Sequence, residues 1–142
     1  MTPTLFGRWQ TRLFLLATVG VVATLPFYLG IIVPNLGAFS FCILAYVALF
    51  GLVWDVLYIY LQRFRWDRDW PGVLQLLTGV WEGLFLACFF KIVGLPGVPK
   101  AEMSLLWFTV HYSLVWLAVY LASQSLMRIL FPRWRFWGGR LL

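Results

Sequence analysis

Four long apolar segments, joined by short loops, constrain the fold of this chain more than any other feature. They run over about residues 13–33, 38–61, 73–93 and 103–130. An α-helix needs about 20 predominantly apolar residues to cross the hydrocarbon core of a bilayer, and each segment reaches that length. The chain is 63% hydrophobic and only 11% charged, whereas soluble domains are about 25% charged. We therefore expect an all-α integral membrane protein that folds as a four-transmembrane-helix bundle.

The length of 142 residues predicts a single transmembrane domain, residues 1–142, with no second folded unit. Beyond the fourth segment, residues 131–142 form a tail that is rich in basic and aromatic side chains. Many of the nine tryptophans lie near segment ends, where an indole ring buries its apolar body and keeps its polar edge among the lipid headgroups.

The basic residues predict the orientation of the four spans. All nine arginines lie before or early in the first segment, in the loop 62–72, or near the tail. Four spans place all of these arginines on one side of the membrane. The only basic residues on the other side are Lys91 and Lys100. Because cytoplasmic loops are enriched in Lys and Arg, we expect both termini in the cytoplasm. The expected location is a cell inner membrane or another energy-transducing membrane.

Arginines at the edges of spans favour contact with lipid phosphates. The net charge of +6 invites a nucleic-acid interpretation, but basic side chains at membrane edges serve topology and headgroup contact. We therefore expect the lipid bilayer as a partner and no nucleic acid. Ion pairing within an interfacial turn is the alternative for the loop arginines. The candidates for headgroup contact are Arg63, Arg65, Arg68, Arg133 and Arg135.

Three ionisable residues, Asp55, Glu82 and His111, fall inside the predicted spans. A charged side chain at the bilayer centre costs roughly 2.5–3.5 kcal/mol on insertion scales, so such residues are candidates for function. Helical rise places them at depths that differ by only about 10 Å. With the polar residues on the same helix faces they form a candidate relay or ligand site, whose alternative is a polar cluster that fixes helix register. The remaining members of this site are Tyr58, Gln75 and Thr78.

Small residues recur every four positions around Glu82, at Gly79, Gly83 and Ala87. Such a ladder lets a second helix approach closely in a membrane. The sequence leaves open whether that helix belongs to the same chain or to a second copy.

The sequence contains no recognisable catalytic, metal or cofactor motif. Cys42 and Cys88 lie inside apolar segments without Cys-x-x-Cys spacing, and the single histidine lacks a partner for a zinc or bis-histidine haem motif. We therefore predict no catalytic residue, no bound metal and no cofactor.

Three functions agree with these features. The first is a non-enzymatic accessory or assembly subunit that acts through helix–helix packing, as a homo-oligomer or in a larger membrane complex. The second is an oligomeric proton- or cation-coupled transporter or channel that uses Glu82, Asp55 and His111. The third is a lipid-acting enzyme that combines Glu82 and His111 with the arginine loop.

Overall fold

The computed structural model describes residues 2–34, 36–101 and 103–141. Asn35, in the first predicted loop, and Leu142, at the end of the predicted tail, lie outside the described residues. The fold is helical throughout, with elements α1 Leu5–Leu15, η1 Leu16–Gly20 (a π-helical turn), α2 Val21–Tyr28, α3 Phe39–Gln62, α4 Gly72–Ile92, α5 Leu105–Gln124 and α6 Leu126–Leu130.

Four stretches of the described chain are long and apolar enough to cross a membrane, which confirms the predicted helical architecture at that level. They are Leu5–Tyr28, Phe39–Gln62, Gly72–Ile92 and Leu105–Leu130. The last three begin and end within two residues of the predicted spans 38–61, 73–93 and 103–130.

The first helix differs from the predicted span 13–33, because it begins at Leu5 and ends at Tyr28. Thr4 caps its start, where the Thr4 hydroxyl accepts a hydrogen bond from the backbone N–H of Gly7 at 3.1 Å. Gly30, with a φ of 72°, follows its end, and only glycine adopts that conformation without strain. The shift matters because it places Arg8 and Arg12 within the helix and not at its edge.

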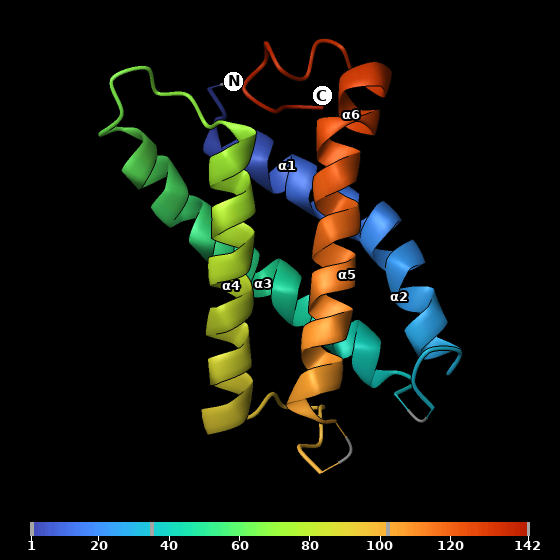
Figure 1. The fold of residues 1–142 in the computed structure, drawn as a ribbon. Helices are drawn as coiled ribbons and strands as arrows, with labels where there is room; N and C mark the ends of the chain where they lie inside the picture. The colour runs from blue at the N-terminus through green and yellow to red at the C-terminus, as the bar shows by residue number, and fades with distance from the viewer. Residues whose placement is uncertain (1, 35, 102, 142) are drawn as a thin grey trace.

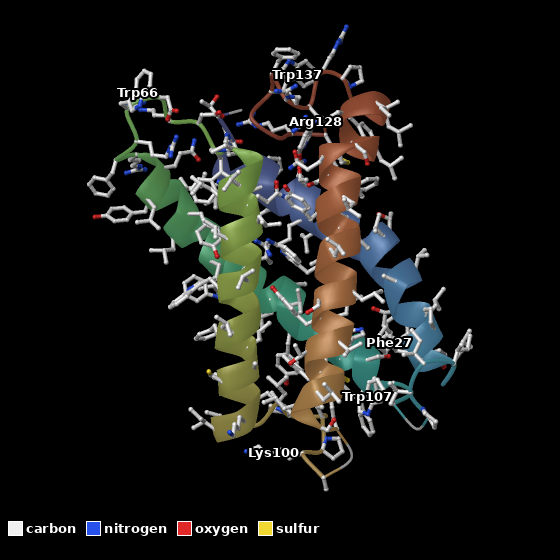
Figure 2. All side chains as sticks on the ribbon, in the orientation of Figure 1. Phe27, Trp66, Lys100, Trp107, Arg128 and Trp137 are labelled. Atoms are coloured by element: carbon white, nitrogen blue, oxygen red, sulfur yellow. The ribbon has the colours of Figure 1, made fainter. Side chains whose placement is uncertain are left out.

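The helices form one bundle in which α4 and α5 stand side by side and α1–α2 and α3 cross behind them (Figure 1). Both termini and the loop between α3 and α4 lie at one end, which we call the terminal end (Figure 1). Arg128 and Trp137 lie at this end, whereas Lys100 and Trp107 lie at the opposite end (Figure 2). The chain therefore passes along the bundle an even number of times.

The main apolar core occupies the half of the bundle away from the terminal end. Phe27, Ile43, Leu86 and Phe108 are each at most 2% exposed there. The rings of Phe90 and Phe108 stack with their centroids 5.4 Å apart. This packing closes the opposite half of the bundle, where Thr24 and His111 are also buried, whereas Arg12, Asp55 and Glu82 lie toward the terminal half.

The tail folds back over α1. The backbone N–H of Thr4 donates to the carbonyl of Gly138 at 2.8 Å, and the Thr11 hydroxyl donates to the carbonyl of Gly139 at 2.8 Å. The indole N–H of Trp134 donates to the Thr11 hydroxyl at 2.7 Å. Gly7 permits this approach, because a Cβ at Gly7 would lie 2.1 Å from the Gly138 carbonyl oxygen. The tail is thus a packed part of the terminal end.

Thiol labelling in oriented vesicles tests the arrangement. In a Cys42→Ser, Cys88→Ser background, Trp66→Cys and Phe136→Cys should react with an impermeant maleimide from one side, and Pro96→Cys only from the other. All three positions are exposed, and the first two lie at the terminal end. Labelling of positions 66 and 136 from opposite faces would contradict the bundle.

Candidate functional site

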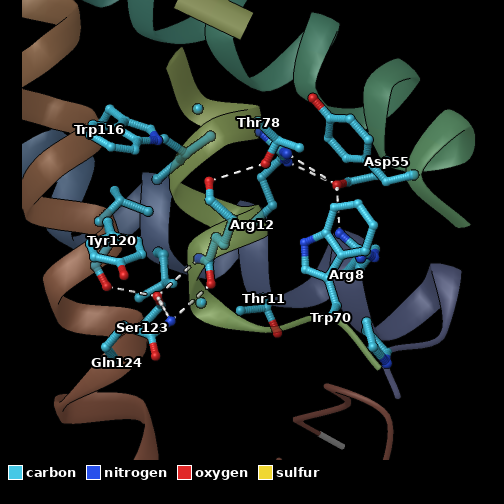
Figure 3. Close-up of a pocket in the computed structure, with 18 of the residues that line it drawn as sticks. Arg8, Thr11, Arg12, Asp55, Trp70, Thr78, Trp116, Tyr120, Ser123 and Gln124 are labelled. Atoms are coloured by element: carbon cyan, nitrogen blue, oxygen red, sulfur yellow. Dashed lines mark hydrogen bonds and ion pairs between the residues drawn. The ribbon is translucent and has the colours of Figure 1, made fainter. Parts of the chain in front are cut away.

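Arg12 binds two carboxylates from two other helices. Its Nε and Nη2 donate to the oxygens of Asp55 at 2.8 and 3.0 Å. Its Nη1 and Nη2 donate to the oxygens of Glu82 at 2.9 and 3.0 Å. The guanidinium therefore uses all of its nitrogens and meets both carboxylates bidentately, the strongest geometry that such pairs adopt. We call Arg12, Asp55 and Glu82 the charged cluster, part of which appears in Figure 3.

The charged cluster lies deep within its helices. At a rise of about 1.5 Å per residue, Arg12 lies about 10 Å from the start of α1 and Asp55 about 10 Å from the end of α3. Glu82 lies about 15 Å from the start of α4 on the same rise. The side chains of Asp55 and Glu82 are only 3% and 7% exposed. A buried charge is costly without a partner, and removing one partner of such a pair typically costs about 3–5 kcal/mol.

Gly51 makes room for Arg12. It lies one helical turn before Asp55 on α3, and a Cβ there would lie 2.2 Å from the Arg12 Nη1. A side chain at this position would displace the guanidinium from its place between the two carboxylates.

Arg8, one turn before Arg12, extends the charged cluster toward the terminal end. Its Nη1 lies 3.8 Å from the nearer Asp55 oxygen. Its guanidinium carbon lies 4.4 Å from the ring centroid of Trp70 and 5.9 Å from that of Tyr58, within the range of cation–π contact. Its side chain is 10% exposed, and its Nε and Nη2 have no hydrogen-bond partner among the described residues.

A cavity of about 230 Å³ leads from the charged cluster toward the terminal end. Its walls come from α1, α3, α4 and α5, and from Arg128 and Arg135 beyond α5 (Figure 3). Between α4 and α5 the wall is polar, because the Gln75 amide donates to the Ser123 hydroxyl at 3.0 Å and the Gln124 amide donates to the Gln75 carbonyl at 2.9 Å. Arg128 in turn donates to the Gln124 side-chain oxygen.

The structure brings most of the predicted polar site together. Asp55 and Glu82 meet through Arg12, and the other predicted members that line the same cavity are Tyr58, Gln75 and Thr78. The cavity is wide enough for water and presents hydroxyl, amide and charged groups, so it suits a polar ligand.

His111 lies apart from the charged cluster, so the structure does not bring this candidate together with Asp55 and Glu82. Its Nε2 lies 3.1 Å from the Thr24 hydroxyl, its ring packs edge-on against Phe27, and it is 1% exposed. Neighbouring positions of a helix point about 100° apart, so Tyr112 faces the cavity while His111 faces α2.

The small-residue ladder packs against α5 of the same chain. The Tyr112 hydroxyl donates to the Gly79 carbonyl at 2.7 Å. A Cβ at Gly79 would lie 1.6 Å from the Trp116 Nε1, and one at Gly83 would lie 2.4 Å from the Tyr112 ring. Ala87, one turn further, packs against the main core. The sequence left open whether this face packs against a helix of the same chain or of a second copy. In the structure, Gly79 and Gly83 pack against α5 of the same chain.

The arginines predicted to contact headgroups have different surroundings. Arg65 forms an ion pair with Asp67 at 3.0 Å, and its hydrogen bonds lower the pKa of the Asp67 carboxyl. Arg63 and Arg68 line a second, shallower depression beside Gln62. Arg133 lies over the Trp137 ring, whereas Arg135 lines the main cavity.

Among the described residues, no three His, Cys, Asp or Glu side chains gather as a metal site would require. No protein-family model, curated protein sequence or solved structure matches this chain. The candidate site therefore rests on its own geometry.

Gly51→Ala should displace Arg12 and destabilise the protein. We expect a loss of roughly 1–3 kcal/mol, as for other overpacked sites, measured as a lower melting temperature in detergent. Gly72→Ala is the matched control, because a Cβ there meets its neighbours only at contact distances of 3.4 Å or more. Equal stability of the two variants would contradict the placement of Arg12.

Thiol accessibility should reveal water in the cavity. In the cysteine-free background, Thr78→Cys should react with a charged methanethiosulfonate added at the terminal end, because Thr78 lines the cavity. Leu77→Cys is the control, since Leu77 is 57% exposed on the apolar outer surface, where a bilayer would exclude the reagent. Equal reactivity at positions 77 and 78 in membranes would argue against a hydrated cavity.

Proposed function

We propose that this protein transports a small charged solute across a membrane, and that the charged cluster is the element that the solute or a proton rearranges. The observation that carries this proposal is the position of the cluster, deep in its helices and in the wall of a cavity that polar side chains also line. Both termini are cytoplasmic in this proposal, so the cavity opens to the cytoplasm of a cell whose inner membrane, or another energy-transducing membrane, holds the protein.

A purely structural role accounts for the geometry less well. Apolar residues of similar volume often replace a buried ion pair without loss of stability, so such a pair is weak support for stability as its purpose. An ion pair with a purely structural role also needs no cavity beside it, yet Arg12 and both carboxylates line the cavity. Charges placed beside water inside a helical bundle are typical of ion and proton pathways.

The cluster offers a simple switch. Asp55 and Glu82 share one guanidinium, so a solute anion that attracts Arg12, or a cation that attracts the carboxylates, weakens the existing pairs. A carboxylate that loses its partner in apolar surroundings then takes up a proton. Solute entry and proton uptake are thereby coupled through Arg12.

The opposite half of the bundle must open for the solute to leave. Phe90, Phe108 and Leu86 close that half, and four helices rarely enclose a complete pathway. The transporter is therefore expected to work as a homo-oligomer, with the exit formed by movement of one helix pair against the other.

The accessory-subunit hypothesis rests in part on the small-residue ladder. The Gly79 and Gly83 face, which the sequence offered for contact with another protein, is filled by Tyr112 and Trp116 of the same chain. The lipid-enzyme hypothesis combines Glu82 with His111. In the structure His111 contacts Thr24 and Phe27.

Transport in proteoliposomes tests the proposal. Vesicles loaded with a pH-sensitive dye are given a panel of small ions, namely inorganic phosphate, acetate, guanidinium and ammonium, under an imposed proton gradient. The wild-type chain should move protons with at least one of them. Glu82→Gln should slow this flux at least about tenfold, because the amide cannot take up a proton or pair with Arg12 as an anion.

Asp67→Asn is the matched control, since the same change of carboxylate to amide falls in the loop between α3 and α4, outside the cavity. It should leave the flux unchanged. A folded Glu82→Gln variant that transports as fast as the wild type would contradict the proposal.

A further inference from the structure

The outer half of the cavity carries arginines that the charged cluster does not neutralise. The cavity is lined by Arg8, Arg12, Arg128 and Arg135 on the basic side and by Asp55, Asp69 and Glu82 on the acidic side. Arg12 engages both Asp55 and Glu82. Within the described residues, neither Arg128 nor Arg135 forms an ion pair, and Arg128 has only the neutral oxygen of Gln124.

Arg8 is the innermost of these arginines, and its hydrogen bonding is incomplete. Nine-tenths of its side chain is buried, and two of its three nitrogens have no acceptor among the described residues. A buried guanidinium is costly unless acceptors surround it, and each exception in a native fold needs an explanation. Its closest carboxylate, Asp55, lies 3.8 Å away and already accepts two hydrogen bonds from Arg12.

The level of Arg128 along its helix indicates which kind of acceptor lies near the arginines of the cavity. About 35 Å of helix separate Leu105 from Arg128 at about 1.5 Å per residue, whereas the hydrocarbon core of a bilayer is about 30 Å thick. In the proposed orientation Arg128 thus lies at the level of the lipid phosphates. Guanidinium groups match phosphate oxygens in charge and in donor geometry.

We propose that the outer half of the cavity binds a phosphate group through Arg8, Arg128 and Arg135, with the Gln124 amide beside it. This inference rests on the proposed function and names its solute as a phosphate-bearing anion. The same chemistry is offered by free inorganic phosphate and by the headgroup of an anionic lipid. The phosphate supplies acceptors to Arg8 and balances the positive charge of the cavity mouth.

Tryptophan fluorescence of the full-length protein in a neutral detergent tests the binding, because Trp70, Trp116 and Trp134 line the cavity. The probes are inorganic phosphate and dihexanoyl phosphatidylglycerol, each titrated at constant ionic strength against chloride. We expect a saturable change with at least one probe. Saturation by phosphate identifies a free anion as a ligand, and saturation by the lipid alone identifies a headgroup.

Arg128→Gln and Arg135→Gln should each weaken that binding at least about tenfold. Arg133→Gln is the matched control, because Arg133 belongs to the same tail but does not line the cavity. All three side chains are exposed, so the variants should fold. Arg8→Met should abolish the fluorescence change, and a melting measurement shows whether that variant is folded.

Absence of a saturable change with both probes in the folded wild type would overturn this inference. An equal affinity of the Arg128→Gln, Arg135→Gln and Arg133→Gln variants would overturn it as well. The two proposals can be contradicted separately. Transport of guanidinium without phosphate binding would contradict only the phosphate site. Phosphate binding without a flux that depends on Glu82 would contradict only the transport function.

Discussion

The pairing of Arg12 with Asp55 and Glu82 is the interaction on which the rest of the structure depends. It joins α1, α3 and α4, three of the helices that surround the cavity. Both carboxylates are buried, and a buried charge is costly unless a partner of opposite charge and hydrogen bonds compensate it. The first helix must therefore begin early enough to carry Arg12 inward, and α3 must present Gly51 where the guanidinium passes. The position of the tail also depends on this early start, because the tail packs on the first turns of α1 through Gly7 and Thr11.

The charged cluster also explains why the bundle has two unlike halves. Away from the terminal end, apolar side chains from α2, α3, α4 and α5 fill the interior, and Phe27 and Ile43 have no exposed surface. Toward the terminal end, Trp116 lies over Gly79 between α4 and α5. Leu15, Ala122, Met127 and Trp134 form a second, smaller apolar cluster there, and the cavity lies beside it. A bundle built this way is closed at one end and holds a cavity at the other, and under the proposed transport function this would be one of the two states of an alternating-access cycle.

The four helices and most of the polar site could be predicted from the sequence, because both depend on periodicity and hydropathy. Asp55, Glu82, Tyr58, Gln75 and Thr78 stand out as polar residues in apolar segments. Arg12 does not, since an arginine before an apolar run is usually a topology signal, and hydropathy then places the helix start after it. Thr4 as a helix cap, with Arg8 and Arg12 one turn apart, was the available signal. The sequence could not decide whether His111 faces Glu82, because neighbouring positions of a helix point about 100° apart, which depth alone does not reveal.

The order of charges along the cavity links the two proposals. Arg135 and Arg128 are exposed, the side chain of Arg8 is 10% exposed, and those of Asp55 and Glu82 in the charged cluster are 3% and 7% exposed. A phosphate that moves inward would leave the exposed Arg128 and Arg135 for Arg8, which lacks hydrogen-bond acceptors. It would then reach Arg12, which is already paired with Asp55 and Glu82. At that last step it competes with Asp55 and Glu82 for Arg12, and a carboxylate left alone among apolar neighbours takes up a proton. The proton offsets the negative charge that the phosphate brings, so the cluster keeps its balance only if the two enter together. In the proposed cycle, coupling would therefore follow from electroneutrality at a buried site and would need no contact between the proton-binding carboxylate and the phosphate.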